Sequence, residues 1–205
     1  MDVDPEKTCF FCGHTWPVFL QTLTFQNKLE RKVKKEIEKA YGRGYRYFLA
    51  SGALGFDMIA ARAVVDFRDA GHPDAELHLL ARDDGRQREY ERLAQKGFPS
   101  VFTRADEVEY LHRDDGPVAL HQRLNIISLY SSLGIFYYNF DIVDHVAGTY
   151  SFFRSTAIEG MRLVNLWEGC PQDEELHPLD VLGTAEQYEE DLPWPPPKAA
   201  GPGIQ

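Results

Sequence analysis

The sequence predicts a three-layer, doubly wound α/β fold with a mostly parallel sheet. Short apolar runs bounded by glycine or polar residues recur along the chain, and such runs are typical of buried strands. Between them lie segments of about ten or more residues with helical patterns. A connection of that length lets the chain cross over and re-enter the sheet in the same direction. The alternation therefore indicates parallel strands with helices on both faces.

The individual elements follow from these patterns. We expect strands at residues 8–12, 45–51, 76–81, 101–103, 134–138 and 163–167. We expect helices from about residue 25 to the glycines at 42 and 44, and at 57–67, 87–95, 118–130 and 151–162. In the first helix an apolar residue recurs every fourth position, from Phe25 to Ile37. The helix at 57–67 is apolar nearly all round, which indicates that it packs into a core. The stretch from 104 to 112 shows neither pattern clearly.

The length of 205 residues favours one domain with appendages. We expect a short N-terminal tail at 1–6, the folded domain at 7–168 and an acidic, proline-rich tail at 171–205. The C-terminal segment contains seven of the twelve prolines and most of the chain's net negative charge. Such a composition buries too little apolar surface to offset the entropy of ordering, so we expect an extended or disordered tail. Its stretch at 193–197 fits either a solvated tail or a polyproline ligand for a protein partner.

Composition argues against several classes of protein. The net charge of −10 disfavours general binding to nucleic acid or to an anionic membrane. No apolar run approaches the roughly 18–20 residues that a membrane span needs. The start of the chain is polar and acidic, unlike a signal peptide, and three cysteines do not make a secreted disulfide framework. The predicted location is the cytoplasm. A homodimer is compatible with this fold, and the sequence leaves the oligomeric state open.

Cys9 and Cys12 form a C-x-x-C pattern, which raises the question of a zinc or redox site. Residues three apart on a strand point to opposite faces, so the two sulfurs would not converge on one ion. No second Cys/His pair with matching spacing follows. We therefore expect two small buried residues and no metal site.

Three strand-to-helix junctions contain glycine and small polar residues, at 13–15, 51–57 and 147–149. Ligands of doubly wound sheets bind at the carboxyl ends of the strands. Glycines let backbone amides approach a ligand, and a helix N-terminus favours negative charge, so these junctions suit phosphate. The predicted ligand is a nucleotide or an ADP-ribose-like molecule. Neither the P-loop motif nor the dinucleotide-binding glycine motif is present.

The order of these motifs resembles the YpsA-like bacterial proteins of the SLOG superfamily, which is related to the Lonely Guy phosphoribohydrolases and the DprA proteins. The resemblance covers residues 7–168 and lies in Cys9-Phe10-Phe11-Cys12-Gly13-His14, in Ser51-Gly52-Ala53-Leu54-Gly55-Phe56-Asp57, in Arg123 and Asn125, and in Gly148-Thr149. It implies a Rossmann-like fold and a pocket for nucleotides or nucleotide-derived signals.

Three positions depart from the pattern of that family. Thr15 stands where an arginine is usual, and Ala147 replaces the first glycine of a Gly-Gly-Thr loop. Phe152 occupies the position at which the Lonely Guy enzymes carry a catalytic glutamate. Without that carboxylate the same hydrolysis has no general acid from this loop. We therefore expect a protein that binds a ligand without catalysis.

The predicted function is that of a sensor or regulator in the bacterial cytosol that binds a nucleotide-like small molecule. One alternative is a nucleotide-processing hydrolase that uses a carboxylate such as Asp57 or Glu159, and another is a protein-interaction module with a degraded pocket. Asp57 suits either a helix cap or a contact to ribose, and Thr149 is the strongest candidate for a phosphate contact. The predicted ligand-binding residues are Gly13, His14, Ser51, Gly52, Ala53, Gly55, Asp57, Arg123, Asn125, Gly148 and Thr149.

Overall fold

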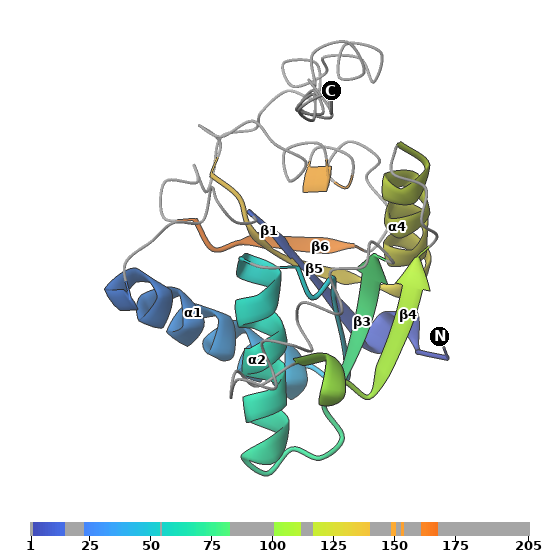
Figure 1. Ribbon diagram of the computed structural model, residues 1–205. Coiled ribbons are helices and arrows are strands. Elements are labelled where there is room, and N and C mark those ends of the chain that lie inside the picture. The colour runs from blue at the N-terminus through green and yellow to red at the C-terminus, as the bar shows by residue number, and fades with distance from the viewer. Residues whose placement is uncertain are drawn as a thin grey trace, which may run out of the picture. The chain divides into compact units, whose positions relative to one another are not determined.

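The sheet is six-stranded and parallel throughout, as the sequence predicts (Figure 1). The computed structural model describes residues 2–14, 23–53, 55–82, 101–111, 117–139, 149–150, 153 and 161–167. The strands are β1 (Thr8–Gly13), β2 (Tyr47–Ala50), β3 (Glu76–Arg82), β4 (Glu107–Leu111), β5 (Leu133–Tyr137) and β6 (Arg162–Asn165). Their order in the sheet is β4-β3-β2-β1-β5-β6, so the direction of winding reverses between β1 and β5.

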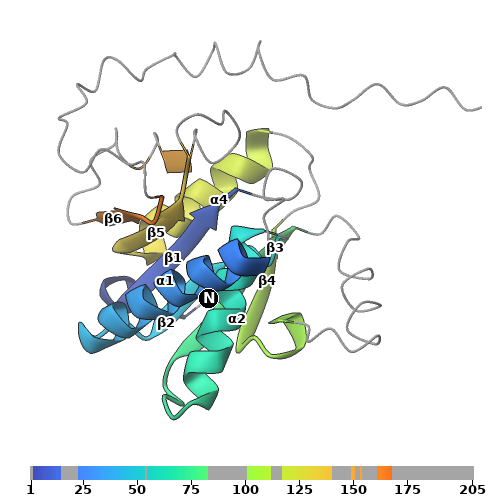
Figure 2. The same ribbon diagram turned by 90° about the vertical axis from the view of Figure 1, so that its left-hand side faces the viewer.

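The helices lie on both faces of this sheet, which gives the three layers of a Rossmann-like α/β fold (Figure 2). Helices α1 (Leu23–Gly42) and α2 (Phe56–Asp69) cover one face, and α4 (Pro117–Tyr130) covers the other. Right-handed crossovers explain this division. The connections that contain α1 and α2 step from β1 toward β3, whereas the connection that contains α4 steps back from β4 to β5. Because the two steps run in opposite directions along the sheet, their helices lie on opposite faces. None of the helices in the described part of the chain combines the length and apolar character of a membrane span.

The core sits on both faces of the central strand β1, all six residues of which are buried. Cys9 and Phe11 face α1 and α2, whereas Phe10 and Cys12 face α4. The two cysteines are therefore small buried core residues on opposite faces, as predicted. Burial also raises the pKa of the Cys9 thiol well above its ordinary value. Neither position resembles a reactive thiolate, which needs exposure and a positive environment.

One predicted strand is wrong. Residues Val101–Thr103 form a short 3-10 helix, η2, and the strand that follows β3 in the sheet is β4, in the stretch that shows no clear pattern. Val101 is buried and Phe102 is partly buried against the core, and neither joins the ladder, because a single turn suffices to bring both side chains onto the core. Strand β4 lies at the edge of the sheet and has only one buried residue. An edge strand tolerates charged side chains, and those of β4 hide the apolar pattern by which a strand is predicted.

The other described strands and helices agree with the predictions to within a few residues at their ends. At the N-terminus, residues Pro5–Lys7 form a 3-10 turn, η1, whose first amides are capped by the side chain of Asp4. The predicted helix at 87–95, most of that at 151–162, and the tail at 171–205 lie outside the described residues.

Candidate functional site

The reversal of strand order places a candidate site at the carboxyl ends of β1 and β5. In open α/β sheets this switch point is where ligands bind. Gly13 and His14 lie at the end of β1, and Ser51 follows β2. Asp57 lies in the first turn of α2, and Arg123 reaches the same region from α4. The fold therefore brings together residues from three of the four predicted segments.

Asp57 is the centre of a buried hydrogen-bond network at this edge. Its side chain is 4% exposed and accepts four hydrogen bonds. Oδ1 accepts from the Gly13 amide at 3.1 Å. Oδ2 accepts from the amide of Ser51 at 3.2 Å and also from its hydroxyl. The fourth donor is Nη2 of Arg123, at 3.2 Å. Oδ2 thus receives three of the four donors and Oδ1 receives one, so Asp57 ties together the ends of β1 and β2 and helix α4.

Local sequence explains why a carboxylate is stable at this buried position. Asp57 belongs to the first turn of α2, where the helix dipole favours a negative charge. The N-cap of the helix is Gly55, and in the described part of the chain no side chain caps α2 there. The preceding loop turns at Gly52, which has φ = 68° and lies against the ring of Phe102. A Cβ at that position would come within 2.7 Å of the ring, so the loop needs glycine for internal packing.

Arg123 has donor groups beyond its pair with Asp57. Its side chain is 18% exposed, and the carboxylate that it meets is already bound by two amides and a hydroxyl. Its Nε is buried and makes no hydrogen bond within the described part of the chain. A guanidinium carries five N–H donors, and a buried donor without an acceptor costs free energy. The arrangement therefore leaves one donor of Arg123, Nε, without an acceptor among the described residues.

His14 connects the end of β1 to the end of β5. Its amide donates to the carbonyl of Tyr137 at 3.4 Å, and its Nε2 accepts from the amide of Asn139 at 2.9 Å. Because Nε2 is the acceptor, the neutral ring carries its proton on Nδ1, an assignment that rests on the hydrogen bond. The carbonyl of His14 accepts from the amide of Phe56 at 3.1 Å, which joins it to the start of α2. His14 thus links three elements through its backbone and ring.

The side chain of Asn165, at the end of β6, fixes the backbone just after β5, between Tyr137 and Asn139. Its Oδ1 accepts from the amide of Tyr138 at 3.0 Å, and its Nδ2 donates to the carbonyl of the same residue at 2.9 Å. The amide of Trp167 also donates to Oδ1, at 3.2 Å. Asn165 is absent from the predicted ligand-binding residues. Its only signal in the sequence is an amide side chain near the end of a predicted strand, which many unrelated asparagines share.

The remaining predicted site residues differ in where they lie. The amide of Ala53 donates to the Ser51 hydroxyl at 3.2 Å, so it stabilises the loop after β2. Asn125 is exposed and follows Arg123 by two positions, which places it about 200° further around the helix. Thr149 is buried, and Gly148 lies outside the described residues. The roles of these four residues in ligand binding stay predictions.

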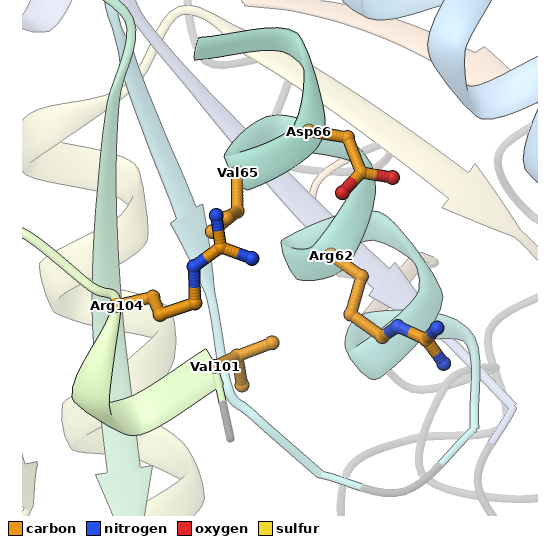
Figure 3. Close-up of a pocket in the computed structure, with 5 residues that line it drawn as sticks. All are labelled: Arg62, Val65, Asp66, Val101 and Arg104. Atoms are coloured by element: carbon orange, nitrogen blue, oxygen red, sulfur yellow. The ribbon is translucent and has the colours of Figure 1, made fainter. Parts of the chain in front are cut away.

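A small pocket lies away from the switch point, between α2 and η2 (Figure 3). Arg62, Val65 and Asp66 line it from α2, and Val101 and Arg104 line it from the other side. Its volume is about 50 Å³, whereas pockets for small-molecule ligands measure roughly 300–1,000 Å³. Arg104 is paired with Asp69 of α2 beside it. This pocket is therefore too small for a nucleotide.

No family model matches the chain. A UPF0398 protein of Shouchella clausii (strain KSM-K16) is 21% identical to it over 101 residues, which is 49% of this chain and 54% of that protein. The chain thus spans about half the length of the curated relative that it matches. This distant similarity supports in part the resemblance to the YpsA-like proteins, and it carries no information on activity.

Proposed function

We propose that the chain binds a nucleotide or a nucleotide-derived ligand at the switch point and acts as a cytosolic sensor or regulator without catalysis. The observation that carries this proposal is the state of Arg123. Its guanidinium is mostly buried and shares the Asp57 carboxylate with three other donors, and its Nε makes no hydrogen bond within the described residues. A phosphate oxygen would supply the acceptor that this donor needs.

The surroundings of Arg123 suit a phosphorylated ligand. Arginine presents planar donors that match two phosphate oxygens at once, and α2 directs the positive end of its dipole toward the same edge of the sheet. In the ligand-free protein Asp57 neutralises the charge of Arg123. When the guanidinium turns toward a ligand, the other three donors still hold the Asp57 carboxylate. The site is thus stable empty and has a cation available for an anion.

The same network supports binding without catalysis. A general base needs a lone pair that is directed at the substrate, whereas the Asp57 carboxylate is buried and held by four donors, three of them on Oδ2. Ser51 is equally occupied, since its hydroxyl donates to Asp57 and accepts from the amide of Ala53. The alternative carboxylate, Glu159, lies outside the described residues.

A thermal-shift screen with AMP, NAD, ADP-ribose and cyclic dinucleotides tests the proposal. A ligand at 100 times its Kd adds about 2.7 kcal/mol of stability, which raises the Tm of a chain of this size by roughly 5–10 °C. We expect Arg123→Gln to lose this shift, because glutamine can still donate to Asp57 but offers neither the charge nor the fork of donors.

The matched control is Arg62→Gln, which removes an exposed arginine from α2. This variant should keep the full shift. Absence of a shift with every nucleotide, or equal shifts in the two variants, would contradict binding at Arg123. Release of a free base or a sugar phosphate during incubation would contradict the proposed lack of catalysis.

A further inference from the structure

We infer that Asp57 is a built-in competitor of the ligand: its carboxylate holds the Arg123 guanidinium in the empty protein, and a ligand binds by taking that guanidinium over. This inference rests on the proposed function and narrows its ligand class to nucleotides with a phosphate monoester. The feature that carries it is the buried ion pair between the two side chains, in which Oδ2 of Asp57 lies 3.2 Å from Nη2 of Arg123.

The ion pair joins the two faces of the sheet across its carboxyl edge. Asp57 belongs to α2, which packs on one face, and Arg123 belongs to α4, which packs on the other. Their side chains are 4% and 18% exposed, so water competes little with either group. The carboxylate therefore occupies the guanidinium as an anionic ligand would, and an anion that reaches this edge meets an arginine that is already paired.

The hydrogen bonds of Asp57 are arranged so that Arg123 can leave it. Oδ2 receives three donors, whereas a carboxylate oxygen offers about two lone-pair sites, so the bond from Arg123 shares a crowded acceptor. Without the guanidinium, the amides of Gly13 and Ser51 and the Ser51 hydroxyl still hold the carboxylate. Because these donors belong to the ends of β1 and β2, the carboxylate stays in place when Arg123 turns toward a ligand.

The competitor sets the charge that a ligand needs. A phosphodiester carries one negative charge, as the carboxylate does, so replacing Asp57 by a diester gains no net attraction to the guanidinium. A phosphate monoester carries about −1.5 to −2 charges at pH 7 and attracts the guanidinium more strongly than Asp57 does. Nucleoside monophosphates should therefore displace Asp57 from Arg123. NAD and cyclic dinucleotides, in which each phosphate carries a single charge, should displace it poorly.

Titration calorimetry of the full chain and of Asp57→Asn tests the competition. The probe is the tightest-binding nucleoside 5′-monophosphate among AMP, GMP, CMP and UMP. Asparagine keeps one oxygen for the backbone amides but lacks the charge that holds Arg123, so we expect it to bind the probe at least about five-fold more tightly. A contact from Asp57 to the ribose would instead weaken binding in this variant. The matched control is Asp74→Asn, which removes a carboxylate from Arg46 at the opposite edge of the sheet and should leave the affinity unchanged.

A pair of ligands tests the charge requirement in the unsubstituted protein, independently of the folding of a variant. The probe and its 5′-methyl phosphate ester share a nucleoside and differ in one phosphate charge. We expect the monophosphate to bind at least about ten-fold more tightly at about pH 7.5. Because the second pKa of a phosphate monoester is about 6, this ratio should fall toward one at about pH 5. The described carboxyl and imidazole groups at this edge are Asp57 and His14, and the methyl ester, whose charge is constant, reports any change that they cause.

Three results would each overturn the inference and leave the proposed function standing. They are equal or weaker binding of the probe by Asp57→Asn, equal affinity for the two esters at the higher pH, and a ratio that stays the same at the lower pH. Binding of NAD or a cyclic dinucleotide without binding of any monophosphate would overturn it as well. Failure of every nucleotide to bind would instead refute the proposed function and the inference with it.

Discussion

Two aspartates at opposite edges of the sheet make similar contacts in different surroundings. Asp57, at the carboxyl edge, binds the hydroxyl of Ser51 and the guanidinium of Arg123. Asp74, in the turn before β3 at the amino edge, accepts from the hydroxyl of Tyr41 at 2.5 Å and from Nε of Arg46 at 2.8 Å. Each carboxylate thus holds one hydroxyl and one arginine. Asp57 is buried, however, whereas Asp74 is exposed.

The difference shows how burial changes the role of the same chemical group. Around Asp74, water competes for every polar atom, so the pair adds little to stability and mainly closes a turn. Around Asp57, water is largely absent, and each donor needs its partner because water cannot replace it there. The buried network therefore fixes the relative positions of β1, β2 and α4. This rigidity is what a preorganised binding site needs.

The largest expected effect follows from removing the buried carboxylate. Asp57→Ala leaves Arg123 without its partner and two backbone amides without acceptors, so we expect a loss of about 3–5 kcal/mol. Urea unfolding measures this change. Asp74→Ala is the matched control and should have a much smaller effect. Equal losses in the two variants would show that burial does not distinguish the two aspartates.

Glycines at the two edges provide a second comparison. Gly52 and Gly44 both have positive φ, 68° and 101°. A Cβ at Gly44 would meet no atom within 4 Å, so Gly44→Ala should cost only the backbone strain of about 1–2 kcal/mol. At Gly52 the Cβ would also press on Phe102, which adds about 1–3 kcal/mol of overpacking. Urea unfolding should show the larger loss at Gly52.

The variant that separates strain from overpacking is Gly52→Ala combined with Phe102→Leu. If overpacking is the cause, the alanine costs less in the leucine background than beside the native phenylalanine. An unchanged cost would assign the whole effect to the backbone conformation.

The sequence predicts the layers, the parallel sheet and most elements, because strand and helix periodicity are local properties of a chain. It misses β4, where an edge strand carries charged residues in its alternation. It also predicts a strand at 101–103, where a single turn packs two apolar residues, Val101 and Phe102, against the core. Both errors have one cause, since burial at the margin of a sheet depends on neighbours that periodicity does not identify.

The candidate site was predicted as a set of residues but not as a network. Asp57 binds Gly13, 44 positions away, and Arg123, 66 positions away, and the bridge from His14 to Asn139 spans 125 positions. From the sequence, Asp57 is predicted to cap a helix or to contact ribose, because its position in the first turn of a predicted helix suits both roles. Its observed partners belong to other elements, so only the fold identifies them.

The exposed aspartate should give stability that depends on pH. The hydroxyl of Tyr41 donates to Asp74, which lowers the pKa of Asp74 below its ordinary value and raises the pKa of Tyr41. Stability from the aspartate is present above its unfolded pKa and is lost as pH falls through the folded pKa. Stability from the tyrosine is present below its unfolded pKa and is lost as pH rises through the folded pKa. The contribution is thus complete between about pH 4 and pH 10.

Thermal unfolding of the unsubstituted protein and of Asp74→Ala across pH checks this window. The difference in Tm between them should be constant in the middle of the range and shrink toward both ends. A difference that persists at pH 2 would show that the Asp74 carboxylate is not the source of the stability.

The smallest expected effect is that of a surface ion pair between helices. Nζ of Lys34 lies 2.7 Å from Glu30 and 3.1 Å from Asp66, and these carboxylates raise the pKa of Lys34. The lysine is 38% exposed, so Lys34→Met should cost about 0.2–1 kcal/mol at low salt. At about 1 M salt this cost should vanish, because the Debye length falls to roughly 3 Å. The cost of Asp57→Ala should persist under the same conditions, and urea unfolding at both salt concentrations measures the contrast.

The place of β1 between β2 and β5 also determines when each of its two edges is covered during synthesis of the chain. The ribosome completes β1 to β4 as four neighbouring strands before it makes the strand that covers the second edge of β1. At roughly 5–20 residues per second, the interval before β5 emerges lasts on the order of seconds. During this interval β1, all of which is buried in the finished fold, presents an open edge, which is a template for pairing with another chain. We expect a fragment that ends at Leu111 to aggregate, as light scattering would report, and the newborn protein to depend on prompt completion of its second half.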